Sequence, residues 1–225
     1  MPTVVLRAST AFPIPHGLDT HRKFLDWLAV ADVPEEVRVG FINGDVWVDT
    51  MSERAFAHNR VKMAVGEVLG PLVRSERLGV YFGDGMTYSA EHADFTSVPD
   101  GIFVSRVTMD AGRVELKGAK PGENDTRLVG VPDLTVEVVS DHSVFKDTEW
   151  LMSGYWNAGV AEYWLIDARR TEPMFRIHRR TAKGYSAVRP VDGWVKSPVF
   201  GRAFRFVAGE VLLSKREYYF EAASR

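Results

Sequence analysis

The chain contains no cysteine among its 225 residues. Disulfide bonds, thiolate zinc sites and cysteine nucleophiles are therefore excluded, and histidine, aspartate and glutamate are the available metal ligands. A reducing compartment is the simplest setting for such a chain, so we expect a cytoplasmic protein.

Long apolar runs are also missing. The densest apolar stretch, Val129 to Val139, already contains Asp133 and Glu137, and nowhere do 18 apolar residues follow one another. The first residues lack a basic segment followed by a long apolar one, so we expect no signal peptide. These absences predict a protein that does not span a membrane.

An excess of positive charge is absent too, because 28 Lys and Arg residues stand against 30 Asp and Glu residues, for a net charge of -2. Any nucleic-acid site must therefore be a local basic patch. The phosphate-binding, dinucleotide-binding, zinc-protease and nucleophile-elbow motifs GxxxxGK[ST], GxGxxG, HExxH and GxSxG are all missing. Nucleotide hydrolysis, dinucleotide redox chemistry, zincin proteolysis and α/β-hydrolase chemistry are disfavoured.

What the chain does contain is ordinary for a folded protein: 45% hydrophobic, 12% aromatic and 26% charged residues. That apolar share is enough to bury a core. The length predicts one domain with added elements rather than two complete ones, and we expect a single domain over residues 1–225.

The first half of the chain alternates helical and strand patterns. Apolar spacing predicts a short helix over 19–28 and a longer one from Ser52 to Pro71. Between them, the segment 37–49 predicts a hairpin through Asn43-Gly44, a favoured two-residue turn.

Three short β-rich runs follow, at 78–82, 98–104 and 113–117, and we expect them to be neighbouring strands. The stretch GAKPGENDTR, residues 118–127, predicts a loop because it combines Gly, Pro, Asn and Asp.

A strand, helix, strand order then occupies 133–166, with Gly159 predicted to end the helix over 145–158. This order is typical of a crossover that joins parallel strands. The remaining segments alternate apolar and polar residues, which predicts an antiparallel C-terminal extension. The fold class we expect is α+β: a mixed sheet with the two long helices packed on it.

Two carboxylates stand out because each lies within an apolar strand, where an unpaired charge is costly to bury. They are Asp100 in SVPDGIFVS and Glu137 in DLTVEVVS, and neither strand supplies an adjacent basic residue. Either the side chains face solvent at a strand end, or a cation such as a divalent metal neutralises them. For Asp100, a plain turn role in the Pro-Asp-Gly string is about equally plausible.

For the other candidate functional residues, a purely structural role is a strong alternative explanation. Lys146 and Asp147 open the helix after the Glu137 strand, but an acid in a first helical turn is favoured by the helix dipole whatever the function. His58, in AFAHNRVK, is by itself better explained as a structural or exposed histidine. The basic residues of 176–183, interleaved with aromatic ones, are better explained by strand alternation than by phosphate binding.

The order GDVWVD, His58, SVPDGIFVS, PDLTVEVVSDHSVFKD and GYWNAGVAEYWLIDAR resembles the Uma-type family of putative restriction endonucleases, within the PD-(D/E)XK nuclease superfamily. The resemblance runs from about Phe24 to about Phe206, and the segment from Val131 to Arg169 is its most specific part.

The resemblance implies a restriction-endonuclease-like mixed sheet core with flanking helices, on which Asp100 and Glu137 are Mg²⁺ ligands, with Mn²⁺ as a substitute. Where the superfamily pattern has a lysine, two residues beyond the acid, this chain has Val139. Many Uma-type sequences place a lysine where Leu151 stands here. Lys146 matches the family version with Lys-Asp at the helix start and is the candidate for a migrated lysine.

We therefore expect a Mg²⁺-dependent nuclease acting on DNA, with Asp100, Glu137, Lys146 and His58 as catalytic residues, the first two as metal ligands and His58 as an accessory. A homodimer is compatible with this reading. Two alternatives stay open: a non-catalytic nucleic-acid or protein binding module on a degenerate nuclease fold, and a hydrolase of smaller phosphate esters.

Overall fold

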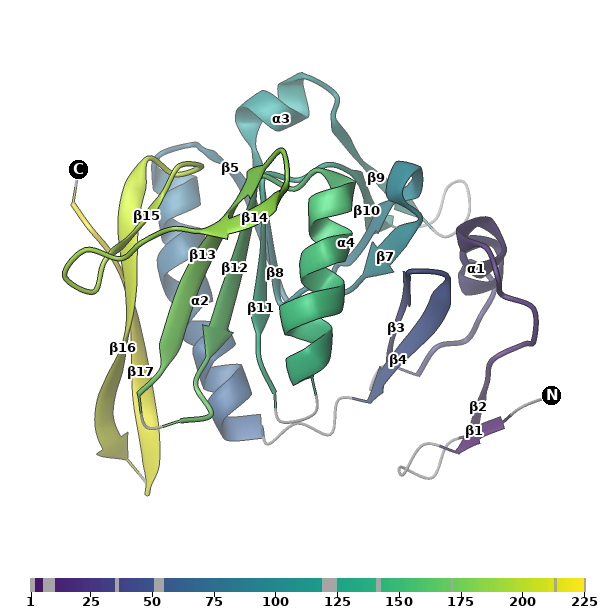
Figure 1. The fold of residues 1–225 in the computed structure, drawn as a ribbon, viewed down its shortest axis with the longest axis horizontal. Helices are drawn as coiled ribbons and strands as arrows, with labels where there is room; N and C mark the ends of the chain where they lie inside the picture. The colour runs from purple at the N-terminus through teal and green to yellow at the C-terminus, as the bar shows by residue number, and fades with distance from the viewer. Residues whose placement is uncertain are drawn as a thin grey trace.

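The computed structural model places two six-stranded sheets side by side, with a three-stranded sheet at one flank and a two-stranded pair near the N-terminus (Figure 1). The described residues are 3–5, 11–34, 37–50, 55–118, 125–140, 143–170, 172–212 and 214–224. None of the helices in these ranges is long and apolar enough to cross a membrane.

The central sheet has the strand order β14-β13-β12-β11-β8-β5. Its strands are β5 (Gly79–Gly83), β8 (Gly101–Ser105), β11 (Leu134–Val138), β12 (Glu162–Asp167), β13 (Met174–Thr181) and β14 (Gly184–Ala187). Only β11 and β12 are parallel in this sheet, and the remaining neighbours are antiparallel.

The crossover between β11 and β12 is helical, as the sequence predicts. It consists of the π-helix η2 (Lys146–Trp150) followed by α4 (Leu151–Ala158). Gly159 ends it with a φ of 91°, a left-handed conformation that glycine adopts without a steric penalty.

The second sheet has the order β4-β3-β7-β6-β10-β9. Its strands are β3 (Val37–Ile42), β4 (Asp45–Thr50), β6 (Thr87–Ala90), β7 (Phe95–Ser97), β9 (Val114–Gly118) and β10 (Asp125–Gly130). The β3–β4 hairpin confirms the predicted turn, because Asn43 and Gly44 both have positive φ, at 54° and 89°.

One strand expectation is wrong. β5 and β8 are neighbours as predicted, but β9 pairs with β10 in the second sheet instead of joining them. The physical reason is that alternation within a strand specifies which face is buried but not which strand lies beside it. Of the predicted loop over 118–127, residues 119–124 lie outside the described residues, and β10 begins at Asp125.

Each face of the central sheet packs against its own helix (Figure 1). On one face, Leu134, Val136 and Val138 pack with α2 (Ala55–Ser75) and the C-terminal sheet. The opposite face packs with α4 and the second sheet. The C-terminal sheet consists of β15 (Val195–Ser197), β16 (Arg202–Leu212) and β17 (Lys215–Ala222), all antiparallel, as the sequence predicts.

Helix α2 extends beyond its predicted end. The pattern predicted a helix to Pro71, but α2 continues to Ser75 with Pro71 inside it. A proline lacks the N–H that would close one helical hydrogen bond, yet burial of Val73 in the core holds the last turn in place.

The smaller elements lie at the periphery. The predicted first helix is α1 (His21–Leu28), whose N-cap is Thr20 and which packs with the β3–β4 hairpin. The others are β1 (Thr3–Val5), β2 (Ala11–Pro13), η1 (Glu91–Ala93) and α3 (Arg106–Asp110).

Tyr155 and Trp164, on opposite faces of the central sheet, are both fully buried. Tyr155→Ala and Trp164→Ala should each lower the free energy of unfolding by about 3–5 kcal/mol, since each removes a large core side chain. Urea denaturation measures this directly. Tyr219→Ala is the control, because that side chain is 48% exposed and should cost less than about 1 kcal/mol. Equal losses in all three variants would contradict the packing.

Candidate active site

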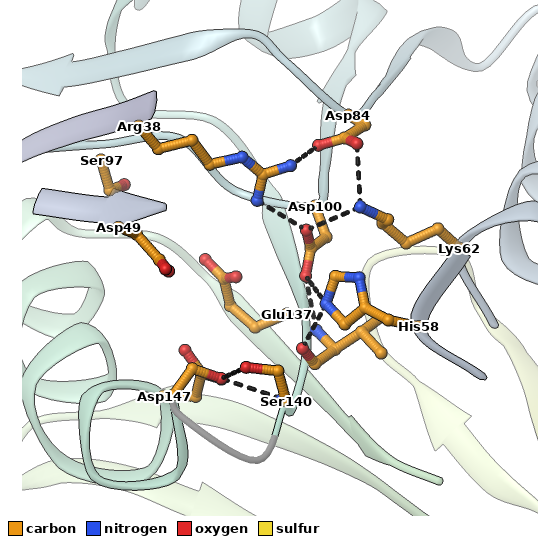
Figure 2. A network of polar contacts seen from close by, with 12 residues as sticks. Arg38, Asp49, His58, Lys62, Asp84, Ser97, Asp100, Glu137, Ser140 and Asp147 are labelled. Atoms are coloured by element: carbon orange, nitrogen blue, oxygen red, sulfur yellow. Dashed lines mark hydrogen bonds and ion pairs between the residues drawn. The ribbon is translucent and has the colours of Figure 1, made fainter. Parts of the chain in front are cut away.

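Asp100 and Glu137 lie together at one end of the central sheet (Figure 2). Gly101 of β8 is paired with Val136 of the antiparallel strand β11. Asp100 precedes Gly101 and Glu137 follows Val136, so these two acids are neighbours across the pair. Both side chains are buried, at 5% and 3% exposure. The strand pairing therefore brings the two acids that the sequence singled out into one buried cluster.

Asp100 is surrounded by donors from other elements. Its Oδ2 accepts from the backbone N–H of Val138 at 2.8 Å, and its Oδ1 accepts from Arg38 of β3 at 3.1 Å and lies 3.7 Å from Lys62 Nζ of α2. Burial by itself would raise the pKa of Asp100, but His58, Arg38 and Lys62 together hold it well below its usual value. Asp100 is thus a buried carboxylate that stays ionised.

The pKa of Glu137 is shifted in the opposite direction from that of Asp100. Burial raises its pKa well above the usual value, and the nearby charges of Asp100 and Asp147 raise it further. Tyr155 of α4 donates its hydroxyl hydrogen to Glu137 Oε1 at 2.6 Å, while Ser97 lies 3.0 Å from the same tyrosine oxygen. The carboxyl is held in place by one phenol, and a cation beside it would favour its ionised form.

Lys146 lies on the same side of the sheet as Glu137, and its side chain is only 12% exposed. Its Nζ donates to Asp49 of β4 at 2.9 Å and lies 3.6 Å from Asp147 Oδ1. Burial opposes its charge, but Asp147, Glu137 and Asp49 raise its pKa. Lys146 is thus a charged ammonium directed into the acidic cluster and not into bulk solvent.

Asp147 also belongs to this cluster. Its side chain is 1% exposed, and Ser143 donates to its Oδ2. Burial raises its pKa to about 7, against the opposing effects of Lys146 and Ser143. Its Oδ1 has no hydrogen-bond partner among the described residues apart from the longer ion-pair contact with Lys146.

His58 supports Asp100 from the first turn of α2. Its Nε2 lies 2.8 Å from the carbonyl oxygen of Val138 and 3.4 Å from Asp100 Oδ2. A carbonyl can only accept, so Nε2 carries the proton. The histidine therefore fixes the end of β11 and the position of Asp100 at the same time.

The chemistry of these groups fits a hard divalent cation. Three buried carboxyls, those of Asp100, Glu137 and Asp147, lie in one cluster, where burial and, to a lesser extent, neighbouring acids raise the pKa of Glu137 and Asp147. One buried carboxylate oxygen, Asp147 Oδ1, lacks a donor. Over the described ranges, no group of three or more His, Asp and Glu side chains is arranged so that it could hold a metal ion.

The two positions at which the family resemblance predicts a lysine, Val139 and Leu151, are filled by core residues. Val139 is 4% exposed and Leu151 is 3% exposed, and both pack in the cluster beneath α4. Neither can be replaced by a charged group without opening this packing. The cations of the site therefore come from Arg38, Lys62 and Lys146.

A small hollow, partly open to solvent, lies beside the cluster. Its walls include Arg38, Trp47, Asp49, Ser97 and Lys146. Two cations that contact the acidic cluster, Arg38 and Lys146, thus also line this hollow.

Sequence reasoning missed Arg38, Lys62, Asp49 and Asp84. Arg38 carries the same signal as the two acids, because it is a charged residue within an apolar strand. Lys62 follows His58 by four residues, which places both on one helix face. Asp84 lies in a Gly-Asp-Gly turn, and no sequence signal separates it from ordinary turn aspartates.

The basic residues of 176–183 lie on β13 and the turn after it, away from these contacts. Arg176, Arg179 and Arg180 are exposed, and Arg180 stacks over the ring of Trp156 at 5.1 Å. They flank the consecutive buried residues Ile177 and His178 on β13, so the strict alternation expected from the sequence does not occur here.

Comparison with known proteins agrees with this architecture. The sequence model of the Uma2 family, described as "Putative restriction endonuclease", matches residues 22–206. A crystal structure described as "a putative nuclease belonging to DUF820 from Anabaena variabilis ATCC 29413" matches with a TM-score of 0.59 and 22% identity, over 84% of this chain and 92% of that one. The fold is shared at this level of similarity, and it is the α+β, nuclease-like fold that the sequence predicts. No curated protein matches the chain.

Proposed function

The chain belongs to the Uma2 family of putative restriction endonucleases, and from this membership we propose that it is a Mg²⁺-dependent endonuclease that hydrolyses DNA phosphodiester bonds. The observation that carries the proposal is the buried pair of Asp100 and Glu137 at one sheet end, with Lys146 directed at the same cluster. Asp100 already has cations beside it, whereas burial and neighbouring acids raise the pKa of Glu137, so a divalent cation beside the pair would favour the ionised form of Glu137.

Asp100 and Glu137 would hold the cation. When bound, Mg²⁺ or Mn²⁺ supplies a positive charge for a phosphate oxygen and lowers the pKa of water. The raised pKa of Glu137 means that its proton must leave before it can act as a ligand, and the tyrosine that donates to it orients the carboxylate.

The other residues would orient Asp100 and stabilise negative charge on the phosphate. His58 and the Val138 N–H keep Asp100 in one orientation and in its ionised form. Lys146 remains protonated near neutral pH because three acids raise its pKa, so it can stabilise the negative charge that builds on a phosphate in the transition state. The proposed catalytic set is thus Asp100, Glu137 and Lys146, with His58 as an accessory that orients Asp100.

Two measurements test the proposal together. Isothermal titration with Mg²⁺ and with Mn²⁺ should show one saturable site on the wild-type protein. Supercoiled plasmid DNA should be nicked or linearised in the presence of either ion and remain intact in EDTA. Saturable binding without any cleavage of plasmid, linear duplex or single-stranded DNA would contradict the endonuclease proposal.

One observation favours a second candidate, a DNA-binding module that has lost cleavage. The family resemblance predicts a lysine two residues beyond Glu137 or at position 151. Both positions hold buried apolar residues here, Val139 and Leu151. A protein that binds DNA in EDTA, binds no divalent cation and cuts nothing would match this second function.

A further inference from the structure

Asp100 and three other charged side chains, those of Arg38, Lys62 and Asp84, form a closed ring of contacts (Figure 2). Arg38 donates to Asp100 Oδ1 at 3.1 Å and also to Asp84 Oδ1. Lys62 Nζ donates to Asp84 Oδ2 at 2.9 Å and lies 3.7 Å from Asp100 Oδ1. Two cations are therefore held between two carboxylates, one belonging to the candidate metal site and the other not.

The ring has an inner and an outer carboxylate. The side chain of Asp100 is 3% exposed, those of Lys62 and Arg38 are 10% and 14% exposed, and that of Asp84 is 38% exposed. Asp84 lies in the turn between β5 and β6, where a Cβ added to Gly83 or Gly85 would meet no atom within 4 Å. The outer carboxylate is thus reached from open space, and the cations lie directly beneath it.

Asp84 holds the two cations in a particular way, because each of its oxygens contacts a different one. A backbone phosphate of DNA also presents two unesterified oxygens with one shared negative charge. Arginine and lysine are the side chains that bind such groups, and arginine does so through a planar fork of donors. A phosphate can therefore replace the Asp84 carboxylate with no change in the charge of the ring.

We propose that Arg38 and Lys62 form a clamp for a backbone phosphate of DNA, and that Asp84 occupies this clamp until DNA displaces it. The inference rests on the proposed function, since it names a substrate contact of the same site. Asp84 is the most exposed member of the ring, so an incoming phosphate meets this carboxylate before it meets the cations. Arg38 and Lys62 remain paired with Asp100 throughout, so the clamp keeps its shape.

The clamp predicts that removal of an acid at the protein surface tightens DNA binding, because Asp84 no longer competes with the phosphate for Arg38 and Lys62. Asp84→Asn should lower the Kd for a short duplex by about tenfold at low salt, the effect of freeing one charge-assisted phosphate contact. Binding is measured by fluorescence anisotropy in EDTA, so that neither a divalent cation nor cleavage enters the readout.

Two further variants make the test specific. Asp26→Asn removes the same charge from an exposed pair with Arg22 on α1, and it should change the Kd by less than about twofold because it lies outside the clamp. Lys62→Met should weaken binding, and Asp84→Asn combined with Lys62→Met should lose the gain of the single change. Thermal unfolding of each variant verifies that the fold is kept.

Several outcomes would overturn the clamp. They are an Asp84→Asn protein that binds no more tightly than wild type, a gain that Asp26→Asn reproduces, and a gain that survives the loss of Lys62. If neither wild type nor Asp84→Asn binds duplex DNA, the clamp is equally refuted. Absence of Mg²⁺-dependent cleavage, in contrast, would overturn only the catalytic proposal, because the binding assay contains no divalent cation.

Discussion

Glu137→Ala and Asp100→Ala are expected to abolish divalent-cation binding and DNA cleavage together. Each change removes one of two carboxylates that would hold the cation, and the remaining acid cannot bind Mg²⁺ tightly by itself. Loss of metal-assisted charge stabilisation amounts to several kcal/mol, so cleavage should fall on the order of 10³-fold or more. Titration calorimetry with Mn²⁺ and a plasmid assay measure the two losses on the same samples.

Glu162 provides the matched control for these two variants, since it is another buried acid of the central sheet. It accepts from Trp164 Nε1 and Ser197 at 2.8 Å each and from the backbone N–H of Val199 at 2.8 Å. Glu162→Gln should therefore weaken folding, by about 1–3 kcal/mol, but leave metal affinity unchanged. A Glu137→Ala protein that still binds Mn²⁺ like wild type would remove the carboxylate pair from the mechanism.

Lys146→Met is expected to separate metal binding from cleavage. The ammonium is not a ligand, so Mg²⁺ affinity should stay nearly intact. The cleavage rate should fall by about 10²–10³-fold, the contribution typical of a single electrostatic stabiliser. Single-turnover cleavage with saturating Mg²⁺ measures the effect on the chemical step.

The control for this change is Lys196→Met on β15, whose side chain is exposed and outside the site. It should cleave at the wild-type rate. Because Asp49 and Asp147 lose their partner in Lys146→Met, its thermal unfolding must also be measured. A stable Lys146→Met protein with the wild-type cleavage rate would leave the ammonium of Lys62 or the guanidinium of Arg38 as the cation that acts on the phosphate.

The local elements were predictable because their signals lie within a few residues. Asn43-Gly44 specified the hairpin, Thr20 capped the first helix, and Gly159 ended the crossover helix. The crossover itself followed from the order of strand, helix and strand, since a connection of that length joins parallel neighbours.

The acids of the candidate site were also visible in the sequence, since each interrupts an apolar strand. That signal is informative but not selective, as Glu162 demonstrates: it is buried to 1% exposure and is satisfied by three donors of the C-terminal half. Only the structure distinguishes a buried acid with a full set of donors from one, such as Glu137, whose neighbours are other acids.

The α+β class, the parallel β11–β12 pair and the two acids within apolar strands followed from the sequence, because turn residues and strand periodicity are local properties. The family followed from the order of its motifs along the chain. The tertiary structure decided which strands are neighbours and which cations reach Asp100. Arg38, Lys62 and Asp84 come from a strand, a helix and a turn that are separated by more than 20 residues each, and only packing of the two sheets and α2 brings their charges together. Electrostatic interactions act over a few ångströms in space, and chain order does not record those distances.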